Sequence, residues 1–226
     1  MCVTAVGLDL DETLAVTDRP REKLLADATQ AVNAPSLSRQ EYLDAHGRHL
    51  TSESRKPIFA DLLADSPEAG ADELTDAYQR AILDALAPLG DIPSLLAELR
   101  REYRVGLLTN GPVAAQRGKL AELGWEDHFD ATVVTGELDA GKPDPHAFEA
   151  LCEALDVSPA EMVYVGDNPE MDVRGANEAG IRTVQVLYPD GPDPEPVADA
   201  YVDRDELVNT LPEIIASLDT CSSDPD

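Results

Sequence analysis

Short apolar runs alternate with segments of helical period along most of this 226-residue chain. The first run, Val3 to Leu8, is rich in β-branched residues and ends directly on a carboxylate, Asp9, as a buried parallel strand ends at a functional loop. Further strands are predicted at 104–108, 131–134, 162–165, 183–186 and 200–202, and helices at 93–102, 113–123, 145–155, 172–179 and 206–218. This alternation predicts an α/β fold with a doubly wound parallel sheet and right-handed crossovers.

The stretch between the first strand and residue 88 has a different pattern. It contains only amphipathic segments, which predict helices at 21–32, 39–50, 54–63 and 73–86, and Ser38 with Glu41 forms a capping-box pattern before the second. We expect a helical cap subdomain at 19–87, inserted into a core formed by 1–18 and 88–218, with a disordered tail at 219–226.

Composition limits the possible partners and compartments. The net charge of −28, from 45 acidic and 17 basic residues, indicates a protein of a salt-accumulating, halophilic cell, since salt screens the self-repulsion. A polyanion repels phosphate backbones, so nucleic-acid binding is not expected. No apolar stretch is long enough to span a bilayer and the start lacks a basic leader, so we expect no membrane association and a cytoplasmic location. The three scattered cysteines predict no disulfide framework.

Residues that could bind a metal or a phosphate follow the first two predicted strands. Strand one runs into Asp9-Leu10-Asp11-Glu12-Thr13, and two carboxylates on one side of a strand end suit a hard cation and a phosphate. The strand at 104–108 ends on Thr109-Asn110-Gly111, where a hydroxyl and amides before a helix can receive phosphate oxygens. Each segment alone is common in turns and helix caps.

Two more segments lie farther along the chain. Gly141 and Pro143 hold Lys142 in a fixed turn, and the strand at 162–165 is followed by Asp167 and Asp172. Every one of these segments follows a strand's carboxyl end, which is where open α/β sheets bind ligands. Their order and position therefore favour a functional site over four unrelated turns.

The four segments resemble, in order, the four motifs of the haloacid dehalogenase-like (HAD) hydrolases. The resemblance covers residues 3–18 and 88–187, and the helical insert is similar to the C1 cap of that superfamily. Glu12 stands where the family usually has glycine. The resemblance implies a Rossmann-like core and a magnesium-dependent phosphatase that acts on a small phosphorylated metabolite.

It also implies a role for each matching residue. Asp9 corresponds to the nucleophile that forms an aspartyl-phosphate, and Asp11 to the general acid that protonates the leaving group and then activates water. Thr109 and Asn110 would hold the phosphoryl oxygens. Lys142 would supply positive charge to Asp9 and to the transition state.

The implied metal is Mg²⁺, bound by Asp9, the backbone carbonyl of Asp11 and Asp167. Asp172 has three possible roles: it could hold a metal-bound water outside the direct ligands, orient Lys142, or cap its helix.

Other functions remain open at this stage. A 2-haloacid dehalogenase would share the nucleophile but expel a halide, which leaves Asp11 without a proton to deliver. A phosphomutase would return the phosphoryl group to a sugar. A non-catalytic binding module would be expected to have lost one of these residues. The sequence indicates neither the substrate nor the oligomeric state.

Five further basic groups in the insert could contact a substrate. They are His46, Arg48, His49, Arg55 and Lys56, and a solvated helical surface is the expectation for them.

Overall fold

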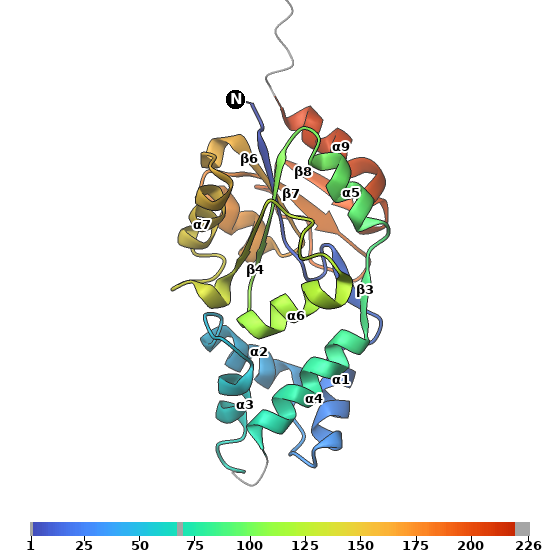
Figure 1. Cartoon of the computed structure of the whole chain (residues 1–226), viewed down its shortest axis with the longest axis vertical. Helices are drawn as coiled ribbons and strands as arrows, with labels where there is room; N and C mark the ends of the chain where they lie inside the picture. Colours follow the sequence, from blue (N-terminus) through green and yellow to red (C-terminus); the bar gives the residue numbers. More distant parts are fainter. Residues whose placement is uncertain (1, 67–69, 220–226) are drawn as a thin grey trace, which may run out of the picture.

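The computed structural model describes residues 2–66 and 70–219 and contains a six-stranded, all-parallel sheet (Figure 1). The strand order is β5-β4-β1-β6-β7-β8, so β1 lies in the interior of the sheet, as its apolar sequence predicts. The strands are β1 (Ala5–Leu8), β4 (Arg104–Thr109), β5 (Ala131–Val134), β6 (Met162–Gly166), β7 (Arg182–Leu187) and β8 (Ala200–Asp203). The predicted α/β fold with a parallel sheet is confirmed.

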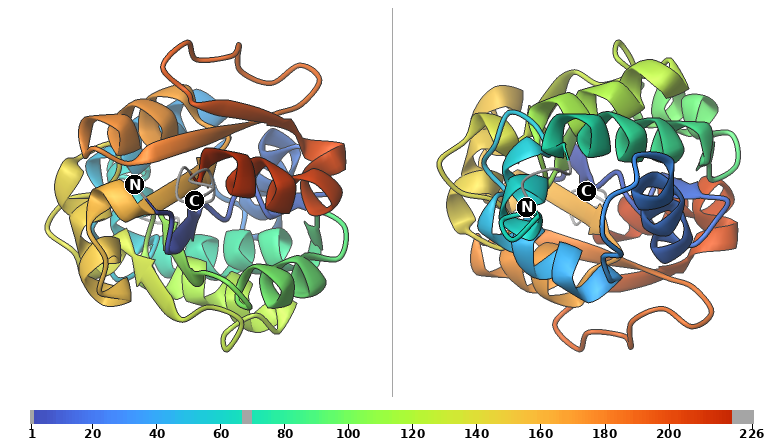
Figure 2. Two further views of the ribbon diagram at one scale, coloured as in Figure 1. Left: turned by 90° about the horizontal axis from the view of Figure 1, so that it is seen from above. Right: turned by 90° about the horizontal axis from the view of Figure 1, so that it is seen from below.

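Helices cover both faces of the sheet (Figure 2). Because side chains alternate along a strand, Val6 and Leu8 of β1 join the hydrophobic cluster on one face and Ala5 joins the cluster on the other. The first face is covered by α5 (Ile92–Leu99), α6 (Val113–Leu123) and α9 (Leu207–Leu218), and the second by α7 (Pro145–Leu155) and α8 (Gly175–Glu178).

Helix α7 packs closely on the sheet because two paired glycines lie beneath it. Gly7 of β1 is in register with Gly106 of β4. A Cβ atom at Gly106 would lie 2.7 Å from Leu151 Cδ1, and one at Gly7 would lie 2.8 Å from Leu151 Cδ2. Side chains at these positions would push the helix off the sheet, and the carboxyl ends of β1 and β4 would shift with it.

The predicted insert consists of helices, and Figure 1 shows them below the sheet. Ser38 and Glu41 form the expected capping box, in which Glu41 Oε2 accepts from the Ser38 backbone N–H at 2.8 Å. These helices enclose a hydrophobic cluster of their own. The helices are α1 (Arg21–Ala31), α2 (Arg39–Arg48), α3 (Lys56–Leu62) and α4 (Ala71–Asp84). The division into core and cap at residues 18 and 88 stays a prediction.

The structure adds a small antiparallel pair that the sequence did not predict. Strands β2 (Ala15–Thr17) and β3 (Leu86–Pro88) pair where the chain leaves the sheet for the helices and where it returns. Three residues are too few to show a strand period, and the prediction carried the helix through Leu86. The pair holds the two crossing segments side by side at the base of the insert.

A second difference concerns the helix predicted at 172–179. The chain turns helical three residues earlier, as a π-helical segment at Pro169–Arg174 that continues into α8. Asn168 caps this segment, since its side chain accepts from Glu170 N and Met171 N. The N-cap residue is therefore Asn168, and Asp172 contributes to this helix end by accepting a hydrogen bond from Asn168 N at 2.9 Å.

The ends of the described chain also bear on the sequence predictions. The predicted disordered tail lies outside the described residues apart from Asp219, whose carboxylate accepts a hydrogen bond from Val3 N at 3.2 Å. Cys2 is disulfide-bonded, a single link that the sequence analysis did not predict, whereas Cys152 is a buried free thiol. Among the described residues, no helix has the length and apolarity that crossing a membrane requires.

Candidate active site

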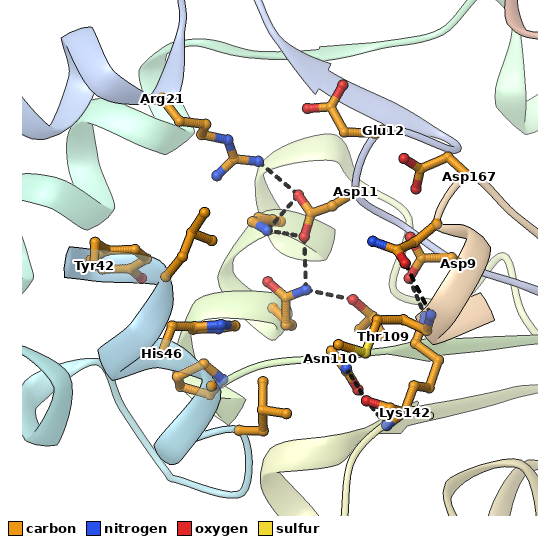
Figure 3. A pocket seen from close by; sticks show the side chains of 18 of the residues that line it. Asp9, Asp11, Glu12, Arg21, Tyr42, His46, Thr109, Asn110, Lys142 and Asp167 are labelled. Carbon is orange, nitrogen blue, oxygen red and sulfur yellow. Dashed lines mark hydrogen bonds and ion pairs between the residues drawn. The ribbon is translucent and has the colours of Figure 1, made fainter. Parts of the chain in front are cut away.

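A cavity of about 450 Å³ lies between the carboxyl ends of the strands and the helical insert. Its lining joins residues from both parts of the chain. Figure 3 shows Asp9, Asp167 and Lys142 on one side, Tyr42 and His46 of α2 on the other, and Asp11 between them. The volume falls in the range of small-molecule sites.

Asp9 and Lys142 form the buried centre of this site. Lys142 Nζ lies 2.7 Å from Asp9 Oδ1 and 2.6 Å from Asp172 Oδ1, and it donates to the Tyr164 hydroxyl at 3.0 Å. Although burial alone would lower the pKa of Lys142, the charges of Asp172 and Asp9 raise it well above its usual value. The lysine is therefore a fixed cation directed at the predicted nucleophile, and Asp172 holds it there.

Three buried carboxylates lie close together beside this one lysine, which contacts two of them. Oxygen atoms of Asp9, Asp167 and Asp172 lie within 4.8 Å of one another. Burial raises the pKa of Asp9 to about 7 and that of Asp167 to about 8. For both groups, the negative charge of Asp172 is the next largest contribution that raises the pKa. The carboxylate oxygens are hard ligands, and a divalent cation would offset their excess negative charge, so the residues present fit the implied Mg²⁺.

Asp11 points away from that cluster into a separate ion-pair network. Its carboxylate accepts from Lys119 Nζ at 2.7 Å, from Arg21 Nη2 at 2.8 Å and from Gln116 Nε2 at 3.0 Å. Burial acts to raise the pKa of Asp11, but the charges of Lys119 and Arg21 outweigh it and hold the pKa far below its usual range. Burial lowers the pKa of Lys119 to about 8, so at pH 7 the pair is ionic.

The sequence analysis did not identify Lys119, Gln116 or Arg21. One signal was available: Gln116 and Lys119 are three residues apart on α6, so they lie on the same face of a helix that follows the Thr109 segment. Nothing local indicated that this face turns toward Asp11. Tyr188, whose hydroxyl donates to Asp167 Oδ2 at 3.1 Å, was also missed.

Thr109 and Asn110 lie at the end of β4, as predicted, but their side chains have protein partners. Thr109 Oγ1 accepts from Gln116 Nε2. The Asn110 amide bridges the backbone of Lys142, accepting from Lys142 N and donating to Lys142 O, both at 2.9 Å. In this arrangement the Asn110 side chain fixes the lysine loop, and its predicted contact with phosphate stays a prediction.

Glu12 occupies the position where the resembling family usually has glycine. Its φ is +62°, in the left-handed region that costs a side-chain-bearing residue free energy. The backbone N–H of Glu12 donates to Ala15 O at 2.9 Å, and its carboxylate pairs with Arg204 at 3.1 Å. The loop thus has the left-handed backbone conformation that favours glycine at this position in the family. The two contacts of Glu12 compensate part of the conformational strain of its positive φ.

Two basic groups of the insert differ from the expectation of a solvated surface. His46 and Arg55 both line the cavity, and Arg55 is 6% exposed. The expectation holds for the others: Arg48 and His49 lie beside Asp61, and Lys56 is exposed.

The chain is similar to known proteins over most of its length. The family model described as haloacid dehalogenase-like hydrolase matches residues 3–180. A glyceraldehyde 3-phosphate phosphatase of Methanopyrus kandleri is 31% identical over 94% of this chain and 98% of its own length. A phosphoserine phosphatase of Thermus thermophilus is 42% identical, but the match covers only 63% of this chain and 59% of that protein. The crystal structure of a HAD phosphatase from Thermococcus onnurineus has a TM-score of 0.67 and 27% identity, covering 92% of this chain and 98% of that one.

The Asp9–Lys142 centre and the acidic cluster thus lie together at the edge of a Rossmann-like sheet. The chain belongs to the haloacid dehalogenase-like hydrolase family. Within that family it is an enzyme of the phosphatase type.

Proposed function

We propose that the protein is a magnesium-dependent phosphomonoester hydrolase that acts on a small phosphorylated metabolite through an aspartyl-phosphate at Asp9. One observation carries this proposal: the Asp9 carboxylate lies at the carboxyl end of the central strand, 2.7 Å from a buried lysine and within a cluster of carboxylates that suits a divalent cation. The names of the phosphatase relatives support the substrate class.

The residues of the centre have distinct tasks. Asp9 attacks phosphorus, a new Asp9–O–P bond forms, and the bond to the leaving alkoxide breaks. Lys142 holds Asp9 in place and offers positive charge to the phosphoryl oxygens. Mg²⁺ held by Asp9, Asp167 and the Asp11 carbonyl would reduce the repulsion between the phosphate and the carboxylates.

Asp11 has two tasks in turn. It must give a proton to the departing alkoxide and then accept one from the water that hydrolyses the aspartyl-phosphate. The pKa of Asp11 is held far below its usual range, so the carboxylate is ionised, which the second task requires. For the first, Asp11 must separate from Lys119 and Arg21 and take up a proton when substrate binds.

Rapid-quench mass spectrometry of two variants distinguishes the role of Asp9 from that of Asp11. Asp9→Asn should form no covalent intermediate with any substrate. With nitrophenyl phosphate, whose leaving group needs no proton, Asp11→Asn should become phosphorylated at Asp9 and hydrolyse that intermediate slowly. Loss of acid–base help costs about 100-fold to 10,000-fold, which is enough for the intermediate to accumulate.

Several outcomes contradict this mechanism. They are a phosphoryl label on another residue, normal turnover by Asp9→Asn, or transfer of the phosphoryl group back to a sugar instead of release as inorganic phosphate. The last result would identify a phosphomutase. Release of halide from a 2-haloacid, with no phosphatase activity, would identify a dehalogenase.

A further inference from the structure

The cavity gathers basic residues in a protein that has few of them. Five of the 17 lysines and arginines line it. Lys142, Lys119 and Arg21 are paired with Asp9, Asp172 or Asp11. The other two, Arg39 and Arg55, come from the insert, and among residues 2–66 and 70–219 no carboxylate forms an ion pair with either of them.

Arg55 is the more unusual of the two because it is buried. It is 6% exposed, its Nε donates to the Tyr42 hydroxyl at 3.1 Å, and its Nη1 donates to Gln79 Oε1. Both partners are neutral. A charge removed from water without a countercharge costs free energy, and no carboxylate among the described residues pairs with this guanidinium. An anion bound in the cavity would supply the missing charge.

A second buried group points to a ligand at the same place. Tyr78 lines the cavity with its side chain fully buried, and its hydroxyl has no hydrogen-bond partner among the described residues. The Arg55 guanidinium lies 5.5 Å from the centre of the Tyr78 ring. Buried hydroxyls are usually hydrogen-bonded, so this one is available to donate to an anionic oxygen.

Arg39 and His46 complete the insert side of the cavity. The Arg39 guanidinium lies 5.3 Å from the centre of the Tyr42 ring, at the first turn of α2. Burial, followed by the charges of Arg55, Lys119 and Arg39, lowers the pKa of His46 to about 4. His46 is therefore neutral at pH 7, and the positive charge on this side comes from the arginines.

We propose that Arg39 and Arg55, with the Tyr78 hydroxyl, bind a second anionic group of the substrate, so that the enzyme prefers phosphorylated metabolites that also carry a carboxylate or a second phosphate. This inference rests on the proposed function. Asp9 and Lys142 lie on the side of the cavity opposite Tyr42 and His46 of the insert (Figure 3). The phosphoryl group would thus bind at the sheet and the second anion at the insert. Guanidinium groups suit both carboxylate and phosphate because they present paired donors.

The wild-type enzyme provides the first test. We would measure kcat/KM at one fixed ionic strength for matched pairs: 3-phosphoglycerate with glycerol 3-phosphate, phosphoglycolate with ethyl phosphate, and fructose 1,6-bisphosphate with fructose 6-phosphate. The first two pairs report on a carboxylate and the third on a second phosphate. In at least one pair, the substrate that carries the second anionic group should be favoured by about 10-fold to 100-fold, as expected for a charge-assisted hydrogen bond.

Variants then locate the preference. Arg55→Gln and Arg39→Gln should each lower the ratio of kcat/KM values within the favoured pair by about tenfold, and Arg55→Lys should retain part of it. Lys56→Gln is the matched control, because Lys56 is an exposed basic residue of the same insert and pairs with Asp72. It should leave the ratio unchanged. If circular dichroism shows that Arg55→Gln is unfolded, the half-buried Arg39→Gln decides.

The outcomes separate this inference from the function on which it rests. Equal kcat/KM values within all three pairs overturn the second-anion site while leaving the phosphatase in place. So does a preference that survives in both arginine-to-glutamine variants. Failure to release phosphate from any monoester, nitrophenyl phosphate included, overturns the proposed function itself and the second-anion site with it.

Discussion

Replacing Lys119 by methionine should destabilise the protein through the carboxylate that it leaves behind. Lys119 is 2% exposed, and its ammonium lies 2.7 Å from Asp11 Oδ1. Methionine fills most of the same volume, so the main loss is the charge. Asp11 would then be a largely buried carboxylate with one cation fewer.

The contacts that Asp11 keeps narrow the expected loss in the free energy of unfolding. Removing one partner of a buried ion pair typically costs about 3–5 kcal/mol. Asp11 keeps Arg21 at 2.8 Å and Gln116 at 3.0 Å, and its side chain is 30% exposed. We therefore expect a loss in the free energy of unfolding below that range, about 2–3 kcal/mol.

A double-mutant cycle with Asp11→Asn isolates the pair. Urea unfolding followed by circular dichroism, at pH 7 in metal-free buffer of fixed salt, gives the four free energies. The double variant should be more stable than the sum of the single losses predicts, with a coupling of about 1–3 kcal/mol. Lys56→Met removes an exposed pair and should cost at most about 1 kcal/mol.

Salt and pH provide further checks on the same pair. The coupling should persist in 1 M potassium chloride, because a buried pair is screened less than a surface pair. The pKa of Asp11 is depressed in the folded protein, so its stabilising contribution is present above its ordinary pKa of 3.8 and is lost as the pH falls further. A coupling below about 0.5 kcal/mol would show that Lys119 does not stabilise Asp11 in this way.

Three other predictions concern the metal, the pH and the salt. Chelation should abolish phosphate release, Mg²⁺ should restore it, Ca²⁺ should restore it poorly, and Asp167→Ala should behave like the chelated enzyme; full turnover in chelator would contradict the magnesium site. Because burial raises the pKa values of Asp9 and Asp167 from 3.8 to about 7 and about 8, the folded metal-free protein binds more protons than the unfolded chain above pH 3.8. Its free energy of unfolding should therefore fall as the pH rises from about 5 to about 8 and level off above that, and Mg²⁺ should weaken this dependence. The charge of −28 predicts a higher unfolding midpoint in molar potassium chloride than in dilute buffer, and equal midpoints would refute the halophilic interpretation.

The sheet and the centre of the site could be predicted because each depends on patterns within short stretches of the sequence. A buried parallel strand is a continuous apolar run, and the residue that follows it is placed by the strand itself. Asp9, Thr109 and Asp167 each follow or end such a run, so parallel alignment alone brings them to one edge of the sheet. Lys142 also follows a strand, β5, but a longer segment separates it from the strand end, so its exact position depends on the loop between them.

The residues that were missed depend on contacts between distant parts of the chain. Lys119 lies 108 residues from Asp11, and the pairing requires α6 to present one particular face to the end of β1. Burial of Arg55 likewise depends on Tyr42 and Gln79, which lie on other helices. No local periodicity encodes such packing, and an isolated basic residue on a helix is most often solvated.

The basic residues of the cavity also explain how so acidic a protein could bind an anionic substrate. A surface with a net charge of −28 repels a phosphorylated substrate, and that repulsion extends over many ångströms unless salt screens it. The attraction from Lys142 and the insert arginines acts at short range within a partly desolvated cavity, where salt screens it less. High salt would thus remove more of the surface repulsion than of the cavity attraction. An acidic exterior is compatible with an anionic substrate when the few basic residues are placed at the site where the anion must bind.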